Sequence, residues 1–115
     1  SMRIETKGHT VIIFQESTDP KGKDFRTDFK DQYKNYTDKN IVMVLLELSY
    51  VGSKHIKEFR EIATFHKETA QKSFVFVTGP LSLKLLPEDL VTVPTLNEAF
   101  DAIEIEEIER DLGYL

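Results

Sequence analysis

The sequence predicts an α/β domain built around one mixed sheet, and three observations support this. Residues 41–48 are apolar at every position but one. Continuous apolarity, rather than alternation, is typical of a strand covered on both faces. A helical pattern follows this strand, and a second buried strand follows that helix at residues 73–78. We therefore expect residues 41–48 to form the centre of a sheet with helices packed above and below it.

The chain begins with a predicted antiparallel hairpin. Residues 3–6 and 9–14 are short strand-like runs, and Lys7 and Gly8 between them form a turn signal at hairpin spacing. Residues 16–23 follow as a loop, because they contain the turn-forming run Asp-Pro-Lys-Gly.

Two amphipathic helices are predicted on either side of the central strand. Residues 24–36 carry aromatic side chains at i, i+4, i+8 and i+11, which places them on one buried face: Phe25, Phe29, Tyr33 and Tyr36. Residues 53–69 form the second helix, and His66 lies on its apolar side. We interpret His66 as a structural histidine of the core, because a lone histidine on an apolar face lacks the partners of a catalytic or metal site.

The C-terminal third predicts a short helical turn at residues 81–86, an edge strand at residues 90–93 and a last helix at residues 95–111. Thr95 and Glu98 have the spacing of a capping box, in which each side chain satisfies a free backbone N–H of the other residue. The predicted order is β-β-α-β-α-β-α-β-α, with about four helices.

Composition narrows the classes of function. With 115 residues the chain predicts one domain with its own core, and the absence of cysteine excludes disulfides and thiol chemistry. The net charge of -5 argues against direct nucleic-acid binding, which needs clustered Lys and Arg. We expect a cytoplasmic protein, because the chain shows neither a leader pattern nor an apolar run long enough to span a membrane.

Motifs for catalysis, metals and cofactors are missing from the sequence. The three histidines, His9, His55 and His66, are too scattered for a metal cluster, and no Gly-x-Ser-x-Gly elbow occurs. The five glycines are dispersed, so they form no phosphate-binding loop. We predict a protein that is not an enzyme and that has no cofactor and no metal.

Several local features accompany the predicted order of elements: a strand over residues 41–49, a Gly-Ser turn into a helix, a strand over residues 74–79, and Val-Pro-Thr at residues 93–95 followed by Glu98, Ala99 and Phe100. Together they resemble the STAS domain, a family that includes the anti-sigma factor antagonists and the cytoplasmic domains of sulfate transporters. The resemblance covers nearly the whole chain. It implies a single STAS-like domain at residues 2–115 that acts as a regulatory or protein-interaction module in bacterial cytoplasm.

The end of the chain, at residues 93–96 and 106–113, is similar to a small group of short bacterial STAS-like proteins that sometimes carry the label ribonuclease Z. That hydrolase has a His-x-His-x-Asp-His metal cluster, which this chain lacks. This resemblance implies an alternative role as an accessory subunit of an RNA-processing hydrolase. A third reading is a STAS-like protein that binds a small ligand.

The resemblance also implies a switch residue, because the serine that the family phosphorylates falls on Ser53. A phosphate at a helix N-terminus meets free N–H groups and the positive end of the helix dipole. Gly52 precedes this serine where the family's switch proteins have Asp, so an ordinary N-cap is the competing interpretation. Gly52, Ser53, Lys54 and Gly79 are candidates for a ligand or partner loop, because such loops leave the carboxyl ends of parallel strands.

The acidic C-terminal helix has two apolar stripes. Its inner stripe is predicted to face the sheet and consists of Leu96, Ala99, Phe100 and Ile103. The other stripe, on the opposite side, consists of Ile105, Ile108 and Leu112. Either the helix bends near Glu104, or its end frays, or the second stripe meets another surface. We favour a protein partner or a second copy, and the six acidic residues between Asp101 and Asp111 favour a basic partner.

Overall fold

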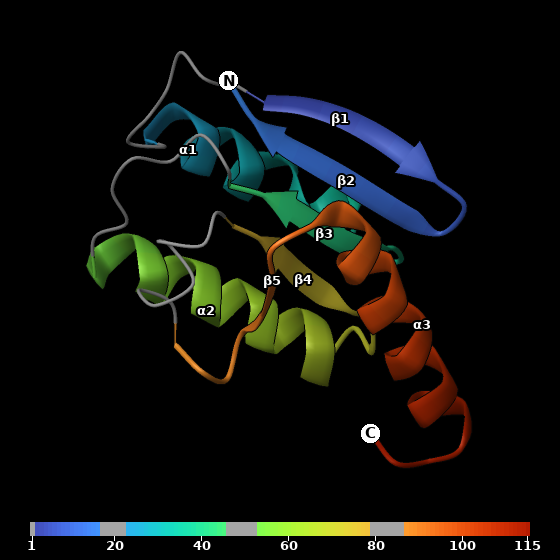
Figure 1. Ribbon diagram of the computed structural model, residues 1–115. Helices are drawn as coiled ribbons and strands as arrows, with labels where there is room; N and C mark the ends of the chain where they lie inside the picture. Colours follow the sequence, from blue (N-terminus) through green and yellow to red (C-terminus); the bar gives the residue numbers. More distant parts are fainter. Residues whose placement is uncertain (1, 17–22, 46–52, 79–86) are drawn as a thin grey trace.

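The computed structural model describes residues 2–16, 23–45, 53–78 and 87–115. Within these residues, five strands form one sheet, flanked by three α-helices and one short 3₁₀ helix (Figure 1). The strands are β1 (Met2–Lys7), β2 (Thr10–Gln15), β3 (Asn40–Val44), β4 (Phe74–Val77) and β5 (Val91–Val93). The helices are α1 (Lys23–Gln32), η1 (Tyr33–Asn35), α2 (Ser53–Glu68) and α3 (Leu96–Asp111).

The strands lie in the sheet in their sequence order, with β3 at the centre, as predicted. β1 and β2 form the predicted antiparallel hairpin, in which Lys7 pairs with Thr10, and the other neighbouring strands are parallel. Gly8 has a φ of 60° in the two-residue turn, which is a left-handed conformation that glycine adopts without a steric cost. The fold class predicted from the sequence, an α/β domain with a mixed sheet, is therefore confirmed.

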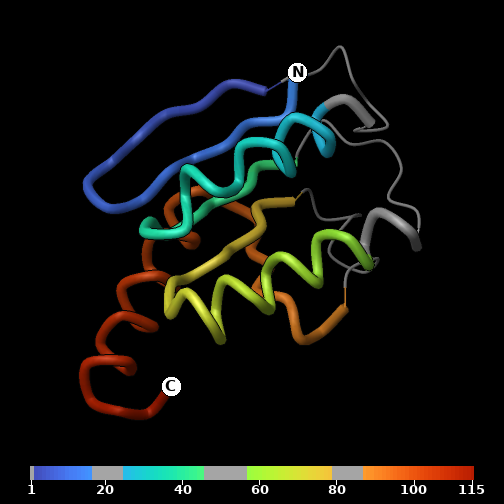
Figure 2. Tube along the Cα trace, turned by 180° about the vertical axis from the view of Figure 1, so that it is seen from behind, coloured from blue at the N-terminus to red at the C-terminus, as the bar shows by residue number. Residues whose placement is uncertain are grey.

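Helices cover both faces of the sheet, as the continuous apolarity of β3 predicted. α1 and α2 lie over one face, where they pack on Ile41 and Met43 of β3 (Figure 2). α3 lies over the other face, where Ala99 and Ile103 pack on Val42 and Val44. Successive side chains of a strand point to opposite faces, so β3 contributes alternate residues to each of the two cores.

The first predicted helix is shorter in the structure. α1 ends at Gln32, and the chain continues as the 3₁₀ helix η1, in which the Tyr36 N–H donates to the Tyr33 carbonyl over 2.8 Å. Such tightening is common at the end of an α-helix, and it still leaves Phe25, Phe29 and Tyr36 buried. The third predicted helix, at residues 81–86, lies outside the described residues.

The predicted capping box at Thr95 forms in part. The Thr95 hydroxyl accepts a hydrogen bond from the Glu98 N–H over 3.2 Å, as expected. The Glu98 carboxylate, however, accepts from the Thr95 hydroxyl over 3.0 Å and not from its backbone N–H. In the part of the chain covered by the structure, no helix is both long enough and apolar enough to span a membrane.

Candidate functional site

The predicted switch region lies at the start of α2. This helix begins at Ser53, as the sequence predicts, and it follows the carboxyl end of β3 along the chain. Gly52 and Gly79 lie outside the described residues, and so do the side chains of Ser53 and Lys54. The roles of these four residues as a cap, a switch or a ligand loop therefore stay predictions.

The outward side of α3 carries three exposed apolar side chains, which we call the outer stripe. Ile105, Ile108 and Leu112 are 56%, 52% and 61% exposed, whereas Ile103 on the inner side is 3% exposed. α3 continues as one helix through Glu104 to Asp111, so the outer stripe does not turn toward the sheet.

The C-terminal end of α3 is held by hydrogen bonds and an ion pair. The Gly113 N–H donates to the Arg110 carbonyl over 3.0 Å, and the Tyr114 N–H donates to the Glu109 carbonyl over 2.8 Å. Gly113 has a φ of 79°, as is usual for the glycine that ends a helix. Lys67 of α2 lies 3.8 Å from the Glu106 carboxylate. These contacts order the end of α3 and do not fit the alternative of a frayed terminus.

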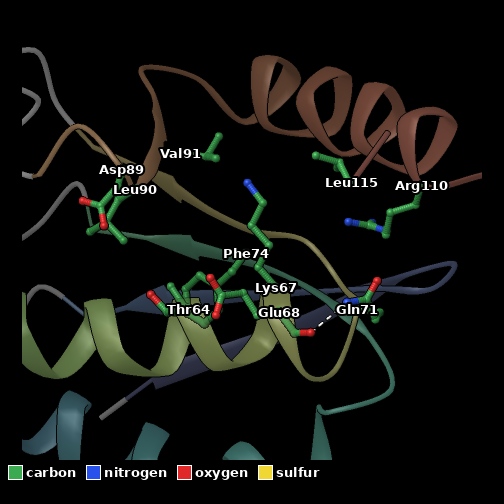
Figure 3. A pocket seen from close by; sticks show the side chains of 11 residues that line it. Thr64, Lys67, Glu68, Gln71, Phe74, Asp89, Leu90, Val91, Arg110 and Leu115 are labelled. Carbon is green, nitrogen blue, oxygen red and sulfur yellow. Dashed lines mark hydrogen bonds between the residues drawn. The ribbon is translucent and has the colours of Figure 1, made fainter. Parts of the chain in front are cut away.

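A cavity of about 400 Å³ opens at the β5 edge of the sheet. Its lining comes from the C-terminal half of α2, the first residues of β4 and β5, and the end of α3. Figure 3 shows the Lys67 and Arg110 side chains extending into the space between α2 and α3. Phe74 and Leu90 supply apolar surface to the same cavity.

Arg110 lines this cavity, and its two terminal guanidinium nitrogens differ in their hydrogen bonding. Its Nη2 donates a hydrogen bond to the Ser73 hydroxyl over 2.8 Å. Its Nη1 is buried, and no acceptor among the described residues bonds to it. Arg110 was not among the candidate residues predicted from the sequence. A signal was present, because Arg110 is the only basic residue between Asp101 and Asp111.

His66 is a structural histidine, as predicted. It is fully buried, its Nε2–H donates to the Lys39 carbonyl over 2.7 Å, and the Tyr33 hydroxyl donates to its Nδ1 over 2.7 Å. Burial lowers the pKa of His66 and raises the pKa of Tyr33 to about 12. Within the described ranges, no three His, Asp or Glu side chains gather in a way that could hold a metal ion.

Of the comparisons with known proteins, the one with solved structures gives a match. No protein-family model matches the chain, and no curated protein matches it. Among solved structures, an anti-sigma factor antagonist from Mycobacterium paratuberculosis is similar, with a TM-score of 0.65 and 16% sequence identity over 90% of this chain and 93% of that chain. The comparisons give no support to the label ribonuclease Z. At this identity the likeness concerns the fold alone, and the chain has the fold of an anti-sigma factor antagonist.

Proposed function

We propose that this protein is a non-enzymatic regulatory domain of the bacterial cytoplasm, which binds another protein through the outer stripe of α3. The observation that carries the proposal is the exposure of Ile105, Ile108 and Leu112 on a helix whose opposite side is buried in the core. The stripe has the i, i+3, i+7 spacing with which amphipathic helices fill apolar grooves.

The order of this helix end supports a role in binding. The hydrogen bond from Arg110 to Ser73 and the ion pair of Lys67 with Glu106 hold the last turns of α3 against the rest of the domain. A partner would therefore meet a preformed helix, and binding would not have to order this segment first.

The acidic residues around the outer stripe indicate which kind of partner could cover it. Six acidic residues and one arginine lie between Asp101 and Asp111. Exposed acids adjoin the stripe, including Glu104 and Glu107. A groove with a basic rim would complement them, whereas a second copy of this chain would bring two acidic helices together. We therefore assign the stripe to a different protein with a basic rim.

The fold supports a regulatory role. The similar solved structure is an anti-sigma factor antagonist, and we extend to this chain the regulatory role in that name. We add, from the resemblance to STAS domains, that Ser53 and the loop residues Gly52, Lys54 and Gly79 are where this binding would be regulated. An accessory role beside an RNA-processing hydrolase has no observation in its favour.

The test compares capture by matched variants. We expect the immobilised chain to capture a basic protein from native cytoplasm, and the double variant Ile108→Ala, Leu112→Ala to lose it. Phe65→Ala is the control, because Phe65 is an exposed apolar residue on α2, 47% exposed. The captured protein, once purified, should bind more weakly as salt is raised, because salt screens exposed charges.

Two outcomes would contradict the proposal. One is equal capture by the full chain and by the α3 double variant. The other is light scattering that shows a dimer of this chain, lost in the double variant, which would assign the stripe to a second copy.

A further inference from the structure

The strand β1 has one side that pairs with no described strand. β1 lies at the edge of the sheet beside β2, and its residues from Arg3 to Lys7 are exposed (Figure 1). At the opposite edge, β5 has three residues and is followed directly by Pro94, which has no N–H to donate. β1 is therefore the longer of the two edges at which another strand can pair.

The hydrogen bonds of the hairpin show which peptide groups of β1 face outward. The His9 carbonyl accepts from the Asn40 N–H over 2.8 Å, so it faces β3, and the peptide groups of the next residue, Thr10, face β1. Thr10 lies opposite Lys7, and the direction of the peptide groups alternates along each strand. The N–H and C=O groups on the free side of β1 therefore belong to Met2, Ile4 and Thr6.

These outward groups match the same strand of a second copy. Two copies of β1 can run antiparallel about a two-fold axis that passes between Ile4 and Ile4 of the second copy. Met2 then lies opposite Thr6, so that the outward N–H and C=O groups of both strands meet as hydrogen-bonded pairs. Ile4 is a large apolar residue that is 39% exposed, and in this register it packs against its own copy.

The charges on β1 select this register. Arg3 and Glu5 point to the opposite face of the sheet from Ile4 and form an exposed ion pair with each other. With Ile4 on the axis, Arg3 of each copy lies opposite Glu5 of the other, so the ion pairs join into a network of alternating charge. A slip of two residues keeps the outward groups in phase, but it places either Arg3 opposite Arg3 or Glu5 opposite Glu5. Like charges directly opposite each other are destabilising, so both neighbouring registers are disfavoured.

We propose that this protein forms a closed dimer through β1, in which the two sheets join with Ile4 on the two-fold axis. An edge of six residues makes a small interface, so the dimer is weak. We expect a monomer at about 10 µM and a dimer at about 1 mM. The outer stripe of α3 is not part of this interface, so the dimer is separate from the proposed binding of a basic protein.

Sedimentation equilibrium measures the association. The average mass should rise from that of one chain at about 10 µM toward twice that mass at about 1 mM. Amide hydrogen exchange of Ile4 and Thr6 should slow at the higher concentration, because their N–H groups become paired. Ile4→Pro removes the N–H on the axis without removing a hydrogen bond to β2, so this variant should fold and remain a monomer.

A pair of charge variants tests the register. Arg3→Glu alone and Glu5→Arg alone each place like charges opposite each other, so each variant should remain a monomer at about 1 mM. Mixed in equal amounts, the two variants place opposite charges at both contacts and should form a mixed dimer. Lys34→Glu is the control, because it changes the net charge as Arg3→Glu does, at an exposed residue outside β1, and should dimerise like the unaltered chain.

Several results would overturn the proposal. These are a mass that stays at one chain at about 1 mM, a dimer that persists in folded Ile4→Pro, and an equal mixture of the charge variants that forms no dimer. The mixture decides the question even if Ile4→Pro fails to fold. A dimer that is lost in the double variant Ile108→Ala, Leu112→Ala but kept in Ile4→Pro would place the contact on the outer stripe instead.

Discussion

His66 shows how one buried polar side chain is accommodated in an aromatic core. Its ring lies against Tyr33 and Phe74, with ring centroids 5.5 and 5.8 Å away. Both ring nitrogens are hydrogen-bonded, one to the Lys39 carbonyl and one to the Tyr33 hydroxyl. Because a carbonyl only accepts, the proton resides on Nε2, and the neutral ring satisfies both partners.

The stability of the protein should fall as the pH falls through the range in which histidine titrates. Burial lowers the pKa of His66 in the folded protein, so below about pH 6.5 the unfolded chain binds a proton that the native ring resists. The contribution of His66 is fully present above that pH and is lost as the pH drops toward the lowered native pKa. Urea unfolding at about pH 7.5 and about pH 5.5 measures this loss of unfolding free energy. The variant His66→Gln should lose less between the two pH values, because it lacks the part that comes from the titration of His66. Equal losses in the two proteins would contradict the assignment.

The predicted cap at Ser53 can be compared directly with the observed cap at Thr95. The Thr95 hydroxyl accepts from the Glu98 N–H, so Thr95→Ala should lower the free energy of unfolding by about 0.5–2 kcal/mol. If Ser53 caps α2, Ser53→Ala should cost a similar amount, and Ser53→Asp should be tolerated because a negative charge is favourable at a helix N-terminus. Urea unfolding measures all three. A neutral Ser53→Ala beside a costly Thr95→Ala would show that Ser53 is not a cap.

At the scale of the element, α3 combines a core helix with a surface helix. Its inner side joins the core under β3 and β4, and its outer side exposes apolar residues of similar size. Lys7 of the hairpin adds a contact from the opposite edge of the sheet, with its ammonium 4.5 Å from the centre of the Phe100 ring. The helix is therefore fixed along its inner side, and its outer side is left for another surface.

The two sides of α3 should respond differently to the same substitution. Ile103→Ala removes buried methyl groups and should cost about 2–5 kcal/mol of unfolding free energy. Ile108→Ala changes an exposed residue of the same type and should stay within about 0.5 kcal/mol. Urea denaturation of the isolated protein measures the cost of each substitution in unfolding free energy. A large cost for Ile108→Ala would mean that the outer stripe is already covered, for example by a second copy.

For the whole molecule, α2 and α3 lie on opposite faces of the sheet and still meet beyond its end. Lys67 of α2 approaches Glu106 of α3, and Arg110 of α3 donates to Ser73, which precedes β4. These contacts connect the two layers and border the cavity. The last turns of α3 thus contribute to the stability of the domain and also carry the proposed binding surface.

A chain that ends at Glu104 tests both contributions. It keeps Ala99 and Ile103 in the core but loses the contacts of Glu106 and Arg110, so we expect a folded and less stable monomer. It also loses the outer stripe and should not capture the partner. Light scattering, urea unfolding and capture measure the three properties. Unchanged stability together with unchanged capture would refute both roles for this segment.

Local sequence patterns determined most of the architecture. The apolar run at β3, the aromatic spacing in α1 and the Thr95–Glu98 spacing each depend on neighbours within a few residues, so strands, helices and caps could be placed without a structure. Two apolar stripes on α3 could be separated by helical periodicity alone. The end of α1 was misplaced, because local periodicity does not show where an α-helix tightens into a 3₁₀ turn.

Only the tertiary structure decided which distant residues meet. Ser73 and Arg110 are 37 positions apart, and no periodicity predicts that the hydroxyl of one would orient the guanidinium of the other. The same holds for Tyr33 and His66, which are 33 positions apart. The cavity at the β5 edge is lined by residues of α2, β4, β5 and the end of α3, so it arises only when these elements pack together. Residue types and local spacing specify elements, whereas the packing of those elements creates the buried charges and cavities that can serve as sites.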